Sequence, residues 1–267
     1  MDHPEDYVKR ILKALIYIED HIEEEISIEA LAKVSCHSPF HFHRIFKMVV
    51  GENVYKYVRR LRLEKAASKL RYTKHPITDI AMDTQYDTPS AFTRAFKQAS
   101  GHSPRNYRIL YKEVNALNKK ISELPKILPD KIEKTEELDL LFIRKLGVYS
   151  ESSFQAWMNM KVFIHENHLD TATIRYFGIT HDDPNVTPED KVRYDACILA
   201  PKNIQPQGNV GRQILKSGKC AIFTHHGSYD GIDETYNRIF FKWLPNSKYI
   251  VDETRPRFAE YFNTNFL

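Results

Sequence analysis

Residues 38–47 read SPFHFHRIFK, and 50 positions later residues 88–97 read TPSAFTRAFK. Pro, Phe, Arg, Phe and Lys recur in register, and a glycine closes each copy, at Gly51 and Gly101. Each copy begins with a hydroxyl residue suited to a helix N-cap, has Pro at the first helical position and ends with Gly, which favours a C-cap. Each stretch therefore predicts one complete helix of about three to four turns.

The residues around each predicted helix complete a larger motif. Phe42 and Phe46 lie four residues apart, so one helix face can be buried while Arg44 projects elsewhere. A shorter apolar-patterned segment precedes each copy, at residues 28–32 and 77–81. A short helix, a tight turn and a second helix with exposed cations are typical of the helix-turn-helix motif that binds DNA. The sequence predicts this motif twice.

Length and composition restrict the class of protein. The chain has 267 residues, enough for two domains with separate cores, and 42% hydrophobic residues, which fits a folded protein. It lacks an apolar run of about 18 residues, and its first residues are acidic, unlike a signal peptide. The three cysteines, Cys36, Cys197 and Cys220, share no metal-like or redox-like spacing. We therefore expect a cytoplasmic protein with reduced thiols and no contact with a membrane.

The positive charge is concentrated on the duplicated segment. Residues 38–112 hold 15 Lys and Arg against 5 Asp and Glu, whereas residues 1–37 hold 4 against 9 and residues 113–267 hold 20 against 21. A basic run alone is also typical of a solvated surface. Together with the repeated motif, it favours contact with a polyanion such as DNA.

Two further helices are expected in this half. Apolar residues at helical spacing over residues 5–24 predict an amphipathic helix that packs on the first motif. Residues 53–73 lack Gly and Pro and predict one continuous helix, about 30 Å long. That length is close to the roughly 34 Å between successive major-groove faces of B-DNA, so the helix would hold the two helix-turn-helix motifs at the spacing of two adjacent major-groove segments. A long core helix is the simpler, compatible interpretation.

Residues 5–110 resemble the DNA-binding domain of the AraC/XylS family of transcription regulators. The most specific part lies in the second half, where the sequence has the family pattern in order: Ile80-Ala81, Phe92-x-Arg94-x-Phe96-Lys97, Gly101, Ser103-Pro104 and Tyr107-Arg108. Gln85 departs from it, because the family usually has Gly there. A positive φ at Gln85 would cost about 1 kcal/mol relative to Gly.

The resemblance implies which residues approach bases. In the family, exposed positions near the N-terminus of each recognition helix face the major groove, and here these are Phe40, His43, Arg44, Ser90, Thr93 and Arg94. The two arginines are suited to guanine, Phe40 to a thymine methyl group, and the hydroxyls to bases or phosphate. The spacing of His37, His41 and His43 also allows a metal site, but no Cys or carboxylate completes it, so we expect no metal ligands.

The second half of the sequence predicts alternating strands and helices. A helix is expected from residue 103 toward 118. Beyond it we expect strands over residues 140–143, 174–179, 194–199, 221–223 and 258–262, and helices over residues 154–168 and 232–243. Gly147-Val148-Tyr149 before the first of these helices matches Gly227-Ser228-Tyr229 before the second. This repeat indicates a duplicated strand-helix-strand-strand unit, hence an α+β domain with a pseudo-twofold cleft.

This part resembles the GyrI-like effector-binding domain. The resemblance covers residues 130–263 and includes the segments 181–184, 187–191 and 193–197. It implies a cleft for a small, cationic or amphipathic molecule, lined by aromatic side chains with a buried glutamate as counter-charge. The implied effector-binding residues are Tyr149, Trp157, Tyr229, Tyr236 and Glu260. The simpler interpretation of these aromatic residues is ordinary core.

The glutamate departs from the family pattern. In direct register, the position of the family's glutamate is occupied by Ala259. Glu260 would then point to the opposite face of its strand, unless a one-residue bulge turns its side chain back toward the cleft.

These observations predict an all-α DNA-binding domain over residues 1–112, a linker over 113–130 and an α+β small-molecule-binding domain over 131–267. We expect a sequence-specific transcription regulator without catalytic residues or cofactors, whose partners are double-stranded DNA, a small effector and RNA polymerase, and which is a monomer or weak dimer. One alternative is a hydrolase of reactive small molecules that uses Glu260 with Tyr149 or Tyr229. The other is an accessory regulator without a ligand.

Overall fold

The computed structural model describes residues 4–117, 123–184 and 186–262. The chain forms two compact units, and each is described by itself. The first unit joins Met1–Glu64, Leu138–Leu215 and Thr254–Leu267; the second joins Lys65–Glu137 and Lys216–Glu253. Each unit thus combines one predicted helix-turn-helix motif with part of the α+β sequence. The expected division at residues 112 and 131 stays a prediction about sequence domains, since the compact units are grouped differently.

The first unit begins with the expected amphipathic helix and the first motif. Its helices are α1 (Pro4–Asp20), α2 (Ile28–Val34), α3 (Pro39–Val50) and the first part of α4 (Val54–Tyr72). Ser27 and Ser38 cap α2 and α3, because each side chain accepts a hydrogen bond from a backbone N–H three residues on. Gly51, in the left-handed region at φ 78°, ends α3 as predicted. Helix α4 is continuous over 19 residues, as its sequence predicts.

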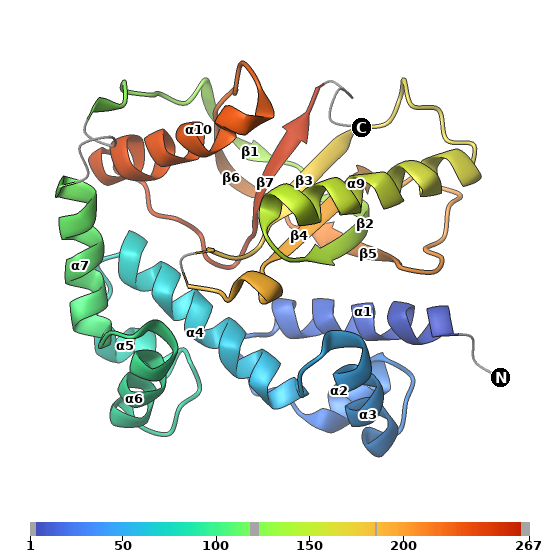
Figure 1. Ribbon diagram of the computed structural model, residues 1–267, viewed down its shortest axis with the longest axis horizontal. Coiled ribbons are helices and arrows are strands. Elements are labelled where there is room, and N and C mark those ends of the chain that lie inside the picture. Colours follow the sequence, from blue (N-terminus) through green and yellow to red (C-terminus); the bar gives the residue numbers. More distant parts are fainter. Residues whose placement is uncertain (1–3, 118–122, 185, 263–267) are drawn as a thin grey trace. The chain divides into compact units, whose positions relative to one another are not determined.

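A five-stranded antiparallel sheet follows in the same unit. Its order is β5-β2-β4-β3-β7, formed by β2 (Leu138–Leu146), β3 (Tyr176–Thr180), β4 (Arg193–Leu199), β5 (Val210–Leu215) and β7 (Arg257–Tyr261). Helix α9 (Tyr149–Glu166) covers one face and α1 the other (Figure 1). Leu141, Ile143 and Trp157 belong to the core under α9, whereas Phe142 and Phe177 pack in the core that contains α1, α2 and α3. One apolar core therefore joins the first motif to the sheet.

The second unit contains the second motif. It comprises the end of α4, α5 (Ile77–Met82), α6 (Pro89–Ser100), α7 (Pro104–Leu117), the two-stranded sheet of β1 (Lys131–Thr135) and β6 (Gly218–Ile222), and α10 (Ile232–Arg238), which continues into a π-helical turn (Ile239–Trp243). Phe92, Phe96 and Leu70 are fully buried. Thr88 caps α6 and Gly101 ends it at φ 77°, which confirms the predicted repeat of α3.

The α+β class is confirmed, with two corrections in detail. Strands β1 and β5 were not expected, since β1 is highly charged and β5 contains Gly211, which lies against the ring of Phe142. The predicted internal repeat has a backbone counterpart, because Gly147 and Gly227 both have φ of 126°. The cleft expected between the two copies stays a prediction. The described helices include none long and apolar enough to cross a membrane.

Candidate DNA interface and ligand-binding face

The recognition helix of the first motif buries one face and exposes the predicted base-reading positions. Phe42, Ile45 and Phe46 are buried, whereas Phe40 is 82% exposed and Arg44 is exposed. Helix periodicity alone produces this separation, because the aromatic pair at positions i and i+4 faces inward.

The three histidines in and before this helix make different contacts. His43 is half-buried, and its ring lies 5.9 Å from that of Tyr55. The guanidinium of Arg44 lies 3.3 Å from Nε2 of His41. His37 stacks on Tyr7 of α1, with 5.9 Å between ring centroids, so this imidazole packs against the neighbouring helix.

Helix α6 exposes a smaller and more neutral surface. Phe92, Ala95 and Phe96 are buried, and the remaining predicted residues, Ser90, Thr93 and Arg94, are exposed. Arg94 is therefore the one long cationic side chain among the three. Hydroxyl groups accept and donate but discriminate less among bases than a bidentate guanidinium does.

Both turns contain a non-glycine residue in the left-handed region. Gln85 has φ of 56°, the conformation in which the sequence predicts a cost, and Cys36 in the first turn has φ of 55°. Since the two angles agree, the departure from glycine at Gln85 leaves the turn conformation like that of the first motif. The equivalent strain at Cys36 was not foreseen.

Several cations of the basic segment stabilise the fold instead of facing solvent. Arg60 donates to Glu52 and Glu64, with the shortest distance at 2.7 Å. Arg62 donates to the backbone carbonyls of Ile22 and Glu24 beyond the end of α1. In the second unit Arg71 lies over the rings of Tyr72, Tyr107 and Tyr111, and Arg108 donates to the carbonyls of Leu70 and His75.

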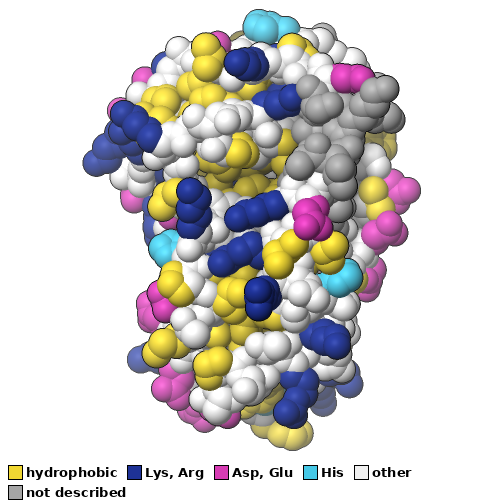
Figure 2. All heavy atoms as spheres, turned by 90° about the vertical axis from the view of Figure 1, so that its left-hand side faces the viewer, with side chains coloured by type: hydrophobic (Ala, Val, Ile, Leu, Met, Phe, Trp, Pro, Cys, Tyr) yellow, Lys and Arg dark blue, Asp and Glu magenta, His cyan; other side chains and the backbone are white. Residues whose placement is uncertain are grey.

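Exposed cations remain on both motifs. They include Arg44, Lys47, Arg94, Lys97 and Arg105. In the face shown in Figure 2, Lys and Arg side chains gather in the middle, over the region of α7, and acidic side chains lie mainly at its margins. Some of the cations counted in the sequence therefore form contacts within the fold, and the others are exposed and available to DNA phosphates.

Two of the predicted effector-binding residues meet on the α9 face of the sheet. Tyr149 makes an edge contact with Tyr194, with 6.2 Å between ring centroids. Trp157 Nε1 donates to Tyr194 Oη at 2.9 Å, and its ring lies 5.6 Å from that of Tyr261. The hydroxyls of Tyr194 and Tyr261 are 3.1 Å apart. We call Tyr149, Trp157, Tyr194 and Tyr261 the aromatic cluster.

Gly178 in β3 leaves the space that this cluster uses. A Cβ atom at this position would lie 2.7 Å from the Tyr261 hydroxyl and also against that of Tyr194. Sequence reasoning did not identify Tyr194 or Tyr261, although both occupy alternate positions of predicted strands. Burial raises the pKa of Tyr149 and Tyr194, so both phenols keep their protons at neutral pH.

Glu260 lies outside the aromatic cluster. The ladder between β3 and β7 is continuous and pairs Glu260 with Phe177 and Tyr261 with Tyr176, so no bulge returns the carboxylate to the α9 face. Glu260 accepts two hydrogen bonds from Arg175 instead, at 2.7 and 3.1 Å. The expected counter-charge at Glu260 is therefore corrected: strand alternation turns it to the other face.

Tyr229 and Tyr236 belong to the second unit. Tyr229 lies in a short 3-10 turn before α10 and is half-buried. Tyr236 stacks on Phe240 with an interplanar angle of 10°, and Phe240 contacts Tyr72.

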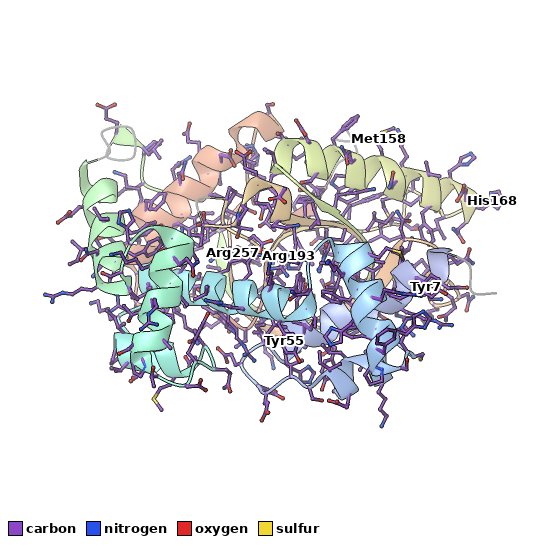
Figure 3. The ribbon with its side chains drawn as sticks, turned by 60° about the horizontal axis from the view of Figure 1, so that its bottom comes forward. Tyr7, Tyr55, Met158, His168, Arg193 and Arg257 are labelled. Atoms are coloured by element: carbon purple, nitrogen blue, oxygen red, sulfur yellow. The ribbon has the colours of Figure 1, made fainter. Side chains whose placement is uncertain are left out.

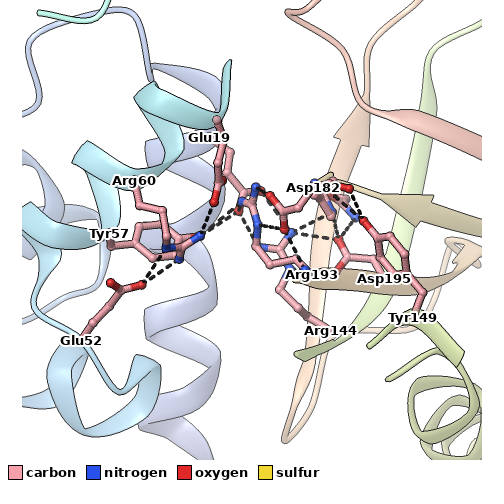
Figure 4. Close-up of polar contacts among 12 residues, drawn as sticks. Glu19, Glu52, Tyr57, Arg60, Arg144, Tyr149, Asp182, Arg193 and Asp195 are labelled. Atoms are coloured by element: carbon pink, nitrogen blue, oxygen red, sulfur yellow. Dashed lines mark hydrogen bonds and ion pairs between the residues drawn. The ribbon is translucent and has the colours of Figure 1, made fainter. Parts of the chain in front are cut away.

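A group of buried ions lies on the opposite face of the sheet, within the first unit (Figure 4). Arg144 on β2 donates to Asp195 directly across the strand pair, at 2.7 Å, and to Glu19 of α1. Arg193 on β4 donates to both oxygens of Asp182 and, at 2.7 Å, to Glu19. We call Glu19, Arg144, Asp182, Arg193 and Asp195 the ion cluster. Figure 3 shows Arg193 in the interior, between Tyr55 on the helical side and Met158 on the outer face of α9.

The electrostatics of the ion cluster follow from its burial. Burial alone would raise the pKa of Glu19, but Arg144 and Arg193 outweigh it and lower the pKa to about 2. Arg193 likewise outweighs burial at Asp182 and lowers its pKa to about 2. Burial and the negative charge of Asp182 raise the pKa of Glu64 to about 7, although Arg60 opposes this. Sequence reasoning missed Glu19, because the two arginines that pair with it lie more than 120 positions away.

Comparisons with known proteins agree with this organisation. The family model described as a GyrI-like small molecule binding domain matches residues 131–266, about half of the chain. A helix-turn-helix domain model matches residues 31–109.

Similar proteins carry regulator names. Residues of this chain are 27% identical over 242 positions to the transcriptional regulator Rob of Salmonella typhimurium, covering 86% of this chain and 83% of that protein. They are 45% identical over 106 positions to the uncharacterized HTH-type transcriptional regulator YbfP of Bacillus subtilis, covering 40% of this chain but only 36% of YbfP. The C-terminal domain of AraT, a response regulator from Geobacillus stearothermophilus, is 36% identical over 39% of this chain and 84% of its own, with a TM-score of 0.35.

Proposed function

The chain belongs to the AraC-type DNA-binding transcriptional regulators that carry a GyrI-like domain, and on that premise we propose that both recognition helices read bases while the aromatic cluster binds a small effector. The observation that carries the first part is the exposure of Phe40, Arg44 and Arg94 on capped helices whose other faces are buried.

The six proposed base-reading residues differ in what they offer. Arg44 and Arg94 have planar donors that match the acceptor edge of guanine, and Phe40 offers an apolar surface for a thymine methyl group. His43, Ser90 and Thr93 can each donate or accept one hydrogen bond to a base or phosphate. We therefore expect α3 to contribute more to sequence preference than α6.

Selection of preferred sites from random duplex DNA with the full chain tests this proposal. We expect a bipartite site, in which Arg44→Ala and Arg94→Ala each relax a different half. Lys161→Ala removes one exposed positive charge from α9 and is the matched control, so it should leave the site unchanged. If binding is insensitive to sequence, or if all three variants behave alike, base reading by these helices is refuted.

The effector-binding part rests on the aromatic cluster. Its phenols, indole and rings offer stacking and hydrogen bonding in a setting where Trp157 and Tyr194 are almost completely buried. We propose Tyr149 and Trp157 as ligand contacts within the first unit. Tyr229 and Tyr236 belong to the second unit, and contact of either with an effector stays a separate prediction from the sequence. We do not include Glu260, since its carboxylate is paired with Arg175 on the other face.

A hydrolase using Glu260 and Tyr149 is disfavoured by the same geometry. The two side chains belong to opposite faces of the sheet, and the raised pKa of Tyr149 keeps its phenol protonated, so it is not available as a base. We also propose RNA polymerase as a partner, a monomer or weak dimer as the oligomeric state, and the cytoplasm as the location.

A further inference from the structure

Hydrogen bonds connect the aromatic cluster to the ion cluster at Asp182. The Tyr149 hydroxyl donates to the backbone carbonyl of Asp182 at 2.6 Å and accepts from its backbone N–H at 3.1 Å. One phenol thus fixes the main chain of Asp182, while the carboxylate of the same residue points to the other side of the sheet and pairs with Arg193. A change in the position of Tyr149 therefore acts directly on a member of the ion cluster.

Arg193 carries this connection to the helices. It holds Asp182 through its Nε and Nη2 atoms, and its Nη1 atom donates to Glu19 of α1 at 2.7 Å and to the Tyr57 hydroxyl of α4 at 3.4 Å. Tyr57 in turn donates to Glu19 at 3.1 Å. Because buried charges are strongly destabilising when a partner is removed, Arg193 cannot follow Asp182 without Glu19 and Tyr57 adjusting as well.

The last contact reaches the first recognition helix. The ring of Tyr57 packs edge-on against that of Phe46, with 5.6 Å between centroids. Phe46 is fully buried and belongs to α3, the helix that exposes Phe40 and Arg44. A displacement of Tyr57 therefore changes the packing that sets the orientation of α3, since close-packed cores transmit small shifts.

We propose that Tyr149, Asp182, Arg193 and Tyr57 form a relay that positions recognition helix α3 according to the occupancy of the aromatic cluster. This inference rests on the proposed function, because it names how the effector site would control DNA reading. These residues contact neither base nor ligand, apart from Tyr149, and act as positioning residues. Coupling of this kind is reciprocal. DNA bound to α3 therefore changes the affinity of the aromatic cluster for its ligand by the same factor as the ligand changes the affinity for DNA.

Tyrosine-to-phenylalanine variants test the relay without an identified ligand. Tyr149→Phe removes the hydroxyl that holds Asp182 but keeps the ring, and it should change the Kd for the duplex selected with the unmodified protein by about 5-fold or more. In a Tyr57→Phe background, which lacks the hydroxyl that contacts Arg193 and Glu19, the same substitution should change Kd less. Tyr176→Phe is the matched control: Tyr176 also packs in the core under α9, but its hydroxyl donates to Thr171, so Kd should stay within about 2-fold.

A reciprocal measurement keeps the test independent of how these variants fold. Trp157 touches both Tyr194 and Tyr261, and Trp243→Phe leaves it as the single tryptophan. Saturation with the selected duplex should shift the emission of Trp157, and Tyr57→Phe should reduce that shift. An unchanged emission in the single-tryptophan protein, or equal effects of Tyr149→Phe and Tyr176→Phe on Kd, would overturn the relay. Absence of any selected duplex would instead refute the proposed function.

Discussion

Replacement of Glu64 by Gln should stabilise the protein at pH 8, although it removes a negative charge beside Arg60. Glu64 lies 3.0 Å from Nη1 of Arg60 in a buried ion pair. Burial and the nearby charge of Asp182 nevertheless raise its pKa from 4.5 to about 7, so the ionised form is unfavourable in the folded protein. The folded protein binds this proton more tightly than the unfolded chain does, so stability falls as the pH rises from about 4.5 to 7 and is level above that.

The size of the effect follows from the pKa shift. A shift from 4.5 to about 7, at 1.36 kcal/mol for each unit, corresponds to about 3 kcal/mol of lost stability at pH 8. Glutamine has nearly the same shape and no charge, so it avoids this loss while keeping an oxygen that accepts from Arg60. We expect Glu64→Gln to be more stable by about 1–3 kcal/mol at pH 8, a rise in Tm of several degrees, and to match the unmodified protein near pH 4.

Thermal unfolding followed by circular dichroism at pH 4, 6 and 8 measures this difference. Glu52→Gln is the control, because Glu52 also accepts from Arg60, at 2.7 Å, and its replacement removes the other negative charge that pairs with this guanidinium. It should lower Tm at pH 8. The reasoning about Glu64 is wrong if its Gln variant is less stable at pH 8, or if its difference from the unmodified protein does not grow with pH.

Three further predictions concern other parts of the fold. Gly178→Ala should lower stability by about 1–3 kcal/mol, measured by urea unfolding, because the added methyl group would press on the hydroxyls of Tyr194 and Tyr261. The lowered pKa of Glu19 adds about 3 kcal/mol to the free energy of unfolding above pH 5, and this contribution is lost as the pH falls to about 2. Glu19→Gln should therefore be less stable than the unmodified protein at pH 7 but lose less stability on acidification. Gln85→Gly should raise stability by about 0.5–1 kcal/mol, because Gly adopts φ of 56° without strain; an unchanged or lower Tm would contradict this.

The sequence predicted those features that depend on near neighbours. The caps at Ser38 and Thr88, the terminating glycines and the buried phenylalanine pairs each need only the residues within a turn or two of a helix. Glu260 also followed local alternation, and its position opposite Phe177 agrees with the direct register of the strand.

Features that depend on distant partners were not predictable. The run of cations on α4 suggests a surface that faces DNA. In the folded protein, however, Arg60 donates to Glu52 and Arg62 donates to the carbonyl of Ile22. Glu19 is one acidic residue among several near the N-terminus, and only its tertiary pairing with Arg144 and Arg193 distinguishes it. Strand β5 is held by its register with β2, whereas its own sequence, interrupted by Gly211, is a weak strand signal.

The ion cluster also predicts an asymmetry between the two halves of the DNA site. All of its described members, together with Tyr57, Phe46 and α3, belong to the first unit. Helix α6 is held by a core in the second unit, built around Phe92, Phe96 and Ile80. An effector that acts through Tyr149 should therefore alter the half-site read by α3 and leave the half-site read by α6 nearly unchanged. Base-by-base affinity measurements on the selected duplex with Tyr149→Phe would separate the two halves, and an equal loss at both would show that control does not pass through α3.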